Sequence, residues 1–370
     1  KNQQNPRHST HMHMHSSLLL LALACGFASI NATVVDTVVG SVNHTTLELL
    51  VTRAGLVTTL SATNRDFTVF APTDDAFTAL GTSPLVTKLT TDPVGIWLPL
   101  LEDVLKYHVL EANSTVLAAA LPTAAQEFPT LSTGSALSVK SVAPQITAVS
   151  PGVGAATVNI ADLTSNNGVV HSINTVLLPP STQRDVTGIV IGSAAHTTLE
   201  TLLGSASLVA TLQAQAQGSA FTVFAPNDDA FAKLDSATLT CLQDSSNVDL
   251  LADLLKFHVV SGFVVSSALT DGQTITPLST TFTTNSFTYE ATGTKLMAGA
   301  GEAAITAVDL LANNGVVHVI DTVLVPTGFS CSIPAETTPV PSIDSASSAS
   351  ASGFLIAGFL AALAVVQARF

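Results

Sequence analysis

An eleven-residue stretch of this chain occurs twice with a single difference, and this repeat limits the possible folds more than any other feature. The first copy begins at Phe67 and reads Phe-Thr-Val-Phe-Ala-Pro-Thr-Asp-Asp-Ala-Phe; the second begins at Phe221, with Asn in place of the second Thr. Three further motifs recur in the same order, starting at His44 and His196, Leu101 and Leu251, and Asn166 and Asn313. The offsets run from 147 to 154 residues, too long for a solenoid repeat, so the chain is predicted to contain two copies of one domain.

The repeated stretch predicts a strand that leads directly into a helix. Its alternating Phe, Thr and Val residues suit a strand buried on both faces, and Pro72 ends the strand because proline has no N–H to donate. Thr73 is a favourable N-cap, and Asp74 and Asp75 place negative charge at the positive end of the following helix. We interpret the paired carboxylates as helix capping, with acid–base or metal chemistry as the alternative.

The rest of each copy indicates a mixture of helices and strands. Apolar residues from Leu47 recur at helical spacing up to Gly55, and a second amphipathic helix over 100–106 is predicted to run into a strand at Tyr107-His108-Val109. The last third is rich in Val, Thr and Ile, and Asn167-Gly168 predicts a hairpin turn between strands over 157–163 and 169–178. This order favours an α+β domain with a largely antiparallel sheet.

Six of the ten histidines form three repeat-equivalent pairs, and the other four lie in the leader. The pairs are His44 and His196, His108 and His258, and His171 and His318. A histidine on an apolar strand face is usually a core residue whose ring nitrogens are hydrogen-bonded, and the alternative is a metal or catalytic role. The chain contains no Gly-x-Ser-x-Gly, His-Glu-x-x-His, phosphate-loop or dinucleotide motif. We therefore predict neither an enzyme nor a metal site.

Both ends of the chain are predicted to be targeting segments. Residues 1–28 contain a short apolar run followed by small residues, the form of a secretory signal peptide. Residues 328–352 are rich in Ser and Pro and predict a stalk, and 353–370 form an apolar tail. Small residues near Ser345, a polar spacer and this tail match a glycolipid (GPI) attachment signal, with a short transmembrane helix as the alternative. The net charge of −14 argues against binding to nucleic acid.

If the protein is secreted as predicted, its cysteines can form a disulfide and its three Asn-x-Ser/Thr sequons can be glycosylated. Cys25 lies in the signal peptide, whereas Cys241 and Cys331 remain in the second copy and are predicted to form a disulfide in an oxidising compartment. Two unpaired thiols are the alternative. Asn-x-Ser/Thr sequons at Asn31, Asn43 and Asn113 are candidate glycosylation sites.

With these motifs established, the sequence resembles two tandem fasciclin domains, over 34–180 and 183–327. The Phe-Thr-Val-Phe-Ala-Pro-x-Asp-Asp-Ala-Phe stretch resembles the first signature of the family. The pattern Asn-Gly-Val-Val-His-x-Ile-x-x-Val-Leu at 167–177 and 314–324 resembles the second, and Tyr107-His108 resembles the tyrosine–histidine motif between them. The resemblance implies two α+β domains, each a β-sandwich-like wedge with flanking helices.

The resemblance also implies a non-catalytic extracellular protein that acts in adhesion or in the organisation of a cell surface or matrix. Its implied location is the outer face of the plasma membrane, the cell wall or the matrix, and its implied partners are surface or matrix proteins or polysaccharides. The positions that match the partner-binding segments of the family are Tyr107, His108, Asp162, Leu163, Phe257, His258, Asp309 and Leu310. Leu replaces the Ile of the family's Asp-Ile pair at both sites, and Phe257 lacks the tyrosine hydroxyl.

An alternative function is transport of an apolar small molecule such as a carotenoid. Some algal members of the family resemble this layout and bind carotenoids. Such a carrier needs a groove lined by apolar and aromatic side chains. The sequence alone predicts no such groove, so no cofactor is assigned.

Overall fold

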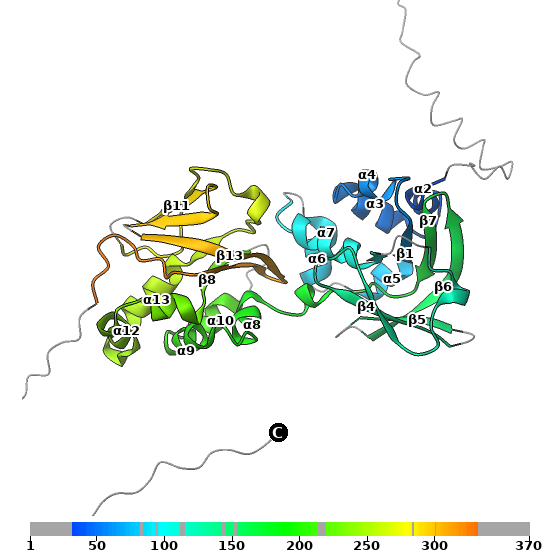
Figure 1. The fold of residues 1–370 in the computed structure, drawn as a ribbon. Coiled ribbons are helices and arrows are strands. Elements are labelled where there is room, and N and C mark those ends of the chain that lie inside the picture. The colour runs from blue at the N-terminus through cyan, green and yellow to red at the C-terminus, as the bar shows by residue number, and fades with distance from the viewer. Residues whose placement is uncertain are drawn as a thin grey trace, which may run out of the picture. The chain divides into compact units, whose positions relative to one another are not determined.

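The computed structural model describes residues 32–331, except 82–83, 93–94, 112–114, 143–144, 151–153, 214–219, 283–284 and 300. These residues form two domains with the same order of helices and strands, and each is considered by itself (Figure 1). The predicted leader, stalk and tail lie outside the described residues, as do Ser345, Asn31 and Asn113. The predicted α+β class and the duplication are confirmed.

The first domain begins with helices and ends with strands. Its helices are α2 (Val34–Val39), α3 (Thr45–Arg53), α4 (Val57–Leu60), α5 (Asp74–Ala79), α6 (Pro84–Thr91), α7 (Leu98–Tyr107) and the 3-10 turn η1 (Ala118–Ala120). Its strands are β1 (Phe67–Pro72), β2 (Val109–Leu110), β3 (Gln126–Pro129), β4 (Ala136–Val142), β5 (Gln145–Ser150), β6 (Gly154–Ser165) and β7 (Gly168–Ile173).

These strands form one seven-stranded sheet in the order β2-β1-β7-β6-β5-β4-β3. Only the β1–β7 pair is parallel among these described strands, so the sheet is largely antiparallel, as the sequence predicted. This pair joins two motifs that are about 100 residues apart in the sequence, with Phe67 opposite Gly168 and Pro72 opposite Ile173. A Cβ on Gly168 would lie 2.0 Å from the Phe67 carbonyl oxygen, so the close pairing requires glycine.

The pair β1 and β7 is buried on both faces, which explains why most residues of both strands are apolar. Phe67, Val69 and Ala71 pack beneath the helices, and Phe70 packs on the opposite side against residues of β4, β5 and β6. Figure 1 shows α2, α3 and α4 on one side of this pair, with β4 and β5 on the other. Each domain is therefore a β-sandwich-like wedge flanked by helices.

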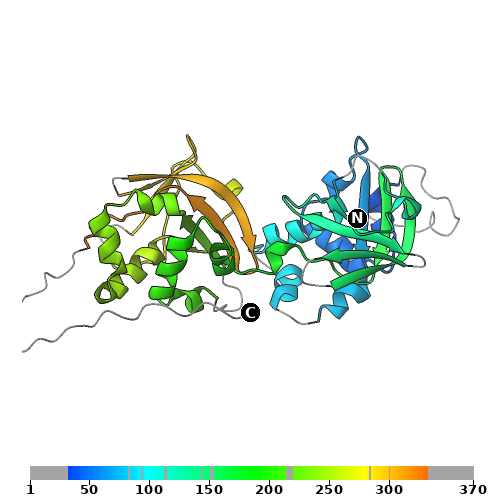
Figure 2. The same ribbon diagram turned by 60° about the horizontal axis from the view of Figure 1, so that its bottom comes forward.

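The second domain repeats this arrangement. Its helices are η2 (Pro180–Thr182) at the domain entry, α8 (Val186–Ile191), α9 (Thr197–Ser205), α10 (Leu208–Gln213), α11 (Asp228–Ala232), α12 (Ser236–Gln243), η3 (Ser245–Asn247), α13 (Val248–Phe257) and η4 (Ser266–Ala268). Its strands are β8 (Phe221–Pro226), β9 (Val259–Ser261), β10 (Thr274–Ile275), β11 (Phe287–Glu290), β12 (Lys295–Ala298), β13 (Gly301–Ala312) and β14 (Gly315–Ile320). The sheet order is β10-β11-β12-β13-β14-β8-β9, and Figure 2 shows the curvature of its later strands, in yellow to orange.

Three local predictions need correction. Tyr107 and His108 do not form a strand: α7 continues to Tyr107, His108 caps the helix, and the strand begins at Val109. The helix that was predicted to end at Gly55 ends at Arg53; Gly55 follows the cap in a left-handed conformation, with φ 68°. The last hairpin strand stops at Ile173 rather than continuing to 178.

Candidate interaction site

The long strands β6 and β13 each contain a bulged segment that carries the Asp-Leu pair singled out by the sequence. The pairing register shifts between Ile160 and Leu163 in β6, and between Ala307 and Leu310 in β13. The aspartate within each bulge has a left-handed backbone, with φ 58° at Asp162 and 57° at Asp309. A bulge with such a residue bends the strand and changes the direction of its side chains.

Each bulge aspartate is held by hydrogen bonds to the 3-10 turn that precedes the strands of the wedge. The Asp162 carboxylate accepts from the Ala118 N–H at 2.8 Å. The Asp309 carboxylate accepts from the Ser266 N–H at 2.7 Å and from the Ser266 hydroxyl. The second domain therefore engages both carboxylate oxygens, whereas among the described residues the second oxygen of Asp162 has no such partner.

A buried histidine supports each bulge from below. Nδ1 of His171 accepts the Asp162 N–H at 3.2 Å, and its Nε2 donates to the Val116 carbonyl at 2.9 Å. His318 makes the equivalent bonds to Asp309 and Val264. Burial lowers the pKa of both rings, and this effect outweighs the nearby carboxylate, which raises the pKa. Each ring is neutral and positions the bulge.

Apolar side chains are exposed around these carboxylates. Ile160 is 48% exposed and Leu117 42%; in the second domain Val308 is 41% exposed and Leu310 37%. Leu163, in contrast, is only partly exposed and packs against the core beneath the helices. Each bulge thus presents an acid next to apolar surface, the composition of a protein-contact patch rather than of a catalytic centre.

The structure places four of the predicted partner-binding residues in the core. Tyr107 and Phe257 are 0% exposed, His108 is 2% and His258 is 3%. The Tyr107 hydroxyl donates to the Ala136 carbonyl at 3.0 Å. The expectation that these four side chains contact a partner is therefore wrong for this structure, because the helix ends and the first sheet strands enclose them. Of the predicted set, Asp162 and Leu310 are exposed, and Leu163 and Asp309 are partly exposed.

His108 and His258 connect parts of the fold instead. Nδ1 of His108 donates to the Val104 carbonyl at 2.7 Å, and Nε2 accepts the Leu177 N–H at 2.9 Å. His258 makes the same bonds to Leu254 and Leu324. Burial lowers the pKa of His108 to about 4 and that of His258 to about 4. The prediction of core histidines with hydrogen-bonded nitrogens concerned an apolar strand face, and it is confirmed for His171 and His318.

The third histidine pair differs between the domains. His44 binds the Ser41 hydroxyl at 2.7 Å and the Ser172 hydroxyl at 3.0 Å. His196 keeps the first bond, to Ser193, but among the described residues its Nε2 is buried without a hydrogen-bond partner. The second domain has Val319 at the position that corresponds to Ser172.

The first of the paired aspartates in each repeated stretch has a structural role. Thr73 caps α5, as predicted. The Asp74 carboxylate, however, binds a different helix: it accepts from the N–H groups of Thr45 and Thr46 and from the Thr45 hydroxyl. These hydrogen bonds lower the pKa of Asp74, and the equivalent bonds lower the pKa of Asp228. Across the described residues, no group of three or more His, Cys, Asp or Glu side chains is arranged to hold a metal ion.

Two buried asparagines, Asn167 and Asn314, have structural roles that the sequence did not predict; Asn167 was predicted only as part of a hairpin turn. Its side chain accepts the Val34 N–H at 2.8 Å and donates to the carbonyls of Leu60 and Ala62. Asn314 makes equivalent bonds to Val186 and Leu212. The repeated Asn-Asn-Gly motif was the available signal, but the bonded helices lie more than 100 residues away in sequence.

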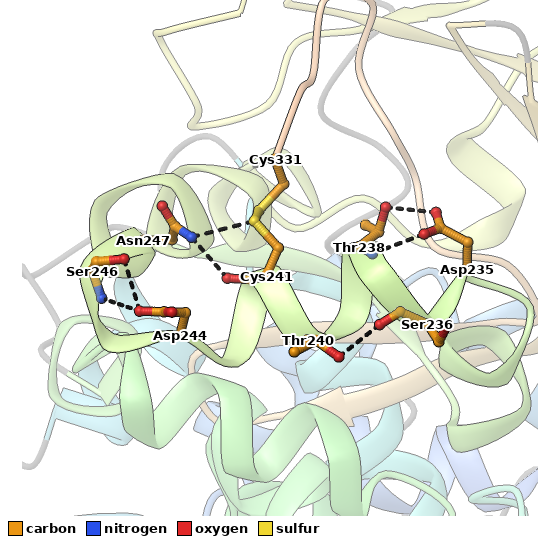
Figure 3. The surroundings of a disulfide bond; sticks show 9 residues. All are labelled: Asp235, Ser236, Thr238, Thr240, Cys241, Asp244, Ser246, Asn247 and Cys331. Carbon is orange, nitrogen blue, oxygen red and sulfur yellow. Dashed lines mark hydrogen bonds between the residues drawn. A yellow bond between two sulfur atoms is a disulfide. The ribbon is translucent and has the colours of Figure 1, made fainter. Parts of the chain in front are cut away.

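A disulfide joins Cys241 of α12 to Cys331, near the end of the described chain (Figure 3). The Cα atoms are 5.9 Å apart, and the bond closes a sequence separation of 90 residues. Asn247 donates to the Cys241 carbonyl at 3.0 Å and approaches its sulfur at 3.2 Å. The bond fastens the chain segment that leaves the second domain to the helical layer of that domain.

Each domain also has an apolar crevice beneath its first helices. The first is lined mainly by valines and leucines of α2, α3 and α4 and has a volume of about 30 Å³; its counterpart has about 20 Å³. Pockets that enclose drug-sized ligands measure roughly 300–1,000 Å³. Neither crevice has room for a carotenoid in this conformation. Among the described helices, none has the length and apolar character needed to cross a membrane.

Comparison with known proteins gives a consistent match. The profile of the fasciclin domain matches residues 42–179 and 194–326. Protein sll1483 of Synechocystis is 32% identical over 138 residues, which cover 37% of this chain and 71% of that protein. Transforming growth factor-beta-induced protein ig-h3 of Sus scrofa is 26% identical over 78% of this chain, and the matched region makes up 38% of that protein. Human periostin is 28% identical over 60% of this chain, and the matched region makes up 24% of periostin. A solved FAS1 domain pair from the insect cell adhesion molecule fasciclin I covers 75% of this chain and 92% of its own, with 18% identity and a TM-score of 0.39.

Proposed function

Because this chain belongs to the fasciclin domain family, we propose that it is a non-catalytic extracellular protein that mediates adhesion or organises a cell surface or matrix. Membership of the fasciclin family supports this role, which is the one that the resemblance of the sequence motifs implies. The proposed partners are surface or matrix proteins or polysaccharides.

The observation that carries the proposal is the exposed bulge of β6 in the first domain. It combines a carboxylate oxygen of Asp162 that accepts no hydrogen bond from any described residue with the exposed side chains of Ile160 and Leu117. A partner with a basic group next to an apolar one complements this surface. The bulge of the second domain is the weaker contact, because Ser266 engages both oxygens of Asp309.

Secretion, glycosylation and a GPI anchor near Ser345 complete the proposal. They are supported by the signal-like leader, the sequons and the stalk with its apolar tail. Treatment of intact cells with a phosphatidylinositol-specific phospholipase is expected to release the protein. Protein that stays on the cells contradicts the anchor, and visible absorbance of the released protein supports the carrier alternative.

The adhesion role is tested by changing the exposed apolar side chain beside Asp162. Ile160→Lys leaves the core intact, since the side chain is 48% exposed, and is expected to reduce attachment of protein-coated beads to cells or matrix about tenfold. The matched control is Val308→Lys at the bulge of the second domain, where Val308 is 41% exposed, and a smaller loss is expected. Undiminished attachment by Ile160→Lys, with an unchanged melting temperature, contradicts the proposed contact surface.

A further inference from the structure

The first domain exposes several large apolar side chains where α2 leads into α3. Val42 is 85% exposed, Leu49 63% and Val39 43%. Exposed apolar side chains that lie together favour self-association or binding. The chain has only 10% charged residues, so charge repulsion between molecules does little to prevent these side chains from associating.

A glycosylation sequon lies in the middle of these residues. Asn43 is exposed, follows Val42 directly and forms the sequon Asn-His-Thr with Thr45. The backbone of Asn43 is fixed, because its carbonyl accepts the Asp74 N–H at 2.8 Å. Its side chain therefore leaves from an ordered turn at the surface.

Leu49 lies on the exposed side of α3, one turn after the last residue of the sequon. The buried residues of this helix are Leu47, Leu50 and Val51. Leu49 lies one turn beyond Thr45, and side chains four residues apart are neighbours on a helix surface. Val39, at the end of α2, and Val42, in the connecting turn, flank Asn43 on its other side in the chain.

The second domain provides an internal comparison. The residues that correspond to Val42, Asn43 and Leu49 are Ala194, Ala195 and Thr201. The sequon is absent, and the two most exposed apolar side chains are replaced by smaller or polar ones. Among these four positions of the second domain, Ile191, which corresponds to Val39, is the one large apolar side chain that is exposed, at 39%. The sequon and the two most exposed apolar side chains, Val42 and Leu49, thus occur together in the first domain, and neither the sequon nor these two side chains occur at the equivalent positions of the second.

We propose that Asn43 carries an N-linked glycan that covers the apolar surface formed by Val39, Val42 and Leu49. A glycan is bulky and strongly hydrated, so it keeps a second molecule from packing on these side chains. The inference rests on the proposed secretion of the protein but not on its adhesive contact. It assigns the glycan a role in keeping the first domain monomeric.

The test compares the secreted protein with variants of the sequon and of the apolar surface. Mass spectrometry after glycosidase treatment is expected to find Asn43 converted to Asp. Asn43→Gln is expected to self-associate about tenfold more strongly in light scattering or sedimentation, because Val42 and Leu49 become available for burial. Adding Val42→Ala and Leu49→Thr, the residues of the second domain, is expected to reverse this gain. Thr45→Ser, which keeps the sequon, is the matched control.

Two results overturn the proposal: secreted protein that is unmodified at Asn43, or an Asn43→Gln variant that associates no more than the parent. Persistent association after Val42→Ala and Leu49→Thr equally contradicts the assigned surface. Bead attachment by the Ile160→Lys variant is measured separately, so failure of the glycan proposal is distinguishable from failure of the adhesion proposal.

Discussion

The Asp74 carboxylate accepts the Thr46 N–H at 2.8 Å, and this bond joins two motifs that the sequence presents as separate. Asp74 belongs to the repeated eleven-residue stretch, whereas Thr46 lies in the first turn of α3, which His44 starts without a side-chain cap of its own. The second domain repeats the bond between Asp228 and Thr198 at 2.8 Å. The aspartate thus supplies the cap that α3 lacks.

Replacing Asp74 by Ala is expected to lower the free energy of unfolding of the first domain by about 1–2 kcal/mol, since a helix loses its cap. Trp97 is the only tryptophan of the chain and is 3% exposed in this domain, so its fluorescence during urea denaturation reports the change. The neighbouring Asp75 is exposed, and Asp75→Ala is the matched control, with an expected change within about 0.5 kcal/mol. Equal effects of the two variants contradict the capping role.

Replacing Gly168 by Ala is expected to disrupt the first domain, at a cost of about 4 kcal/mol or more, because the new Cβ would lie 2.0 Å from the Phe67 carbonyl oxygen. The clash is with backbone, so no side-chain rotation relieves it. Gly204→Ala is the control: no atom lies within 4 Å of its Cβ position, and Ala favours the helix by roughly 0.5–1 kcal/mol. Thermal melts of both variants check this, and a Gly168→Ala protein with the parent melting temperature contradicts the pairing.

Acid is expected to destabilise both domains between pH 6.5 and about 4. The pKa of His108 falls from 6.5 to about 4 on folding, so the unfolded chain takes up a proton that the folded chain does not. The stabilisation is complete above pH 6.5 and is lost as the pH falls toward 4, by up to roughly 3 kcal/mol for this histidine. His258 acts in the same direction in the second domain.

Urea denaturation followed by Trp97 fluorescence at several pH values measures this dependence. His108→Gln is expected to be less stable than the parent at pH 7 and to show a shallower loss of stability on acidification. His258→Gln is the matched control, because it leaves the first domain unchanged. An unaltered pH slope in His108→Gln shows that the ring is not the titrating group.

Reduction of Cys241–Cys331 is expected to destabilise the second domain alone. A bond that closes a 90-residue separation contributes roughly 4 kcal/mol on the chain-entropy model. Calorimetry with and without reductant is expected to show a lower transition for the second domain, while the Trp97 transition of the first domain stays unchanged. Free thiols at both positions in non-reducing peptide maps rule out the disulfide.

The sequence motifs were sufficient to predict the family, the presence of two copies of one domain, and whether most segments are helices or strands. The stretch from Phe67 predicted a strand buried on both faces, because large apolar side chains occur at both odd and even positions along it. Asn167-Gly168 predicted the hairpin between the two last strands of the first domain. The apolar strand faces that carry His171 and His318 also identified these two residues as core histidines, and both are fully buried. These features depend on residues close together in the chain.

Contacts between distant segments were decided by the tertiary structure alone. The sequence predicted that Tyr107 and His108 contact a partner, but both side chains are buried in the structure. Their burial depends on residues that are distant in the sequence and pack over them. It assigned Asp74 to its own helix and Asn167 to a turn, whereas both cap helices that other parts of the chain bring to them. The sequence also did not predict which of the two bulge aspartates has both carboxylate oxygens engaged in hydrogen bonds within its own domain. Asp162 and Asp309 are each followed by Leu in the sequence, but only the Asp309 carboxylate accepts a hydrogen bond from a serine hydroxyl, that of Ser266, 43 residues away in the chain.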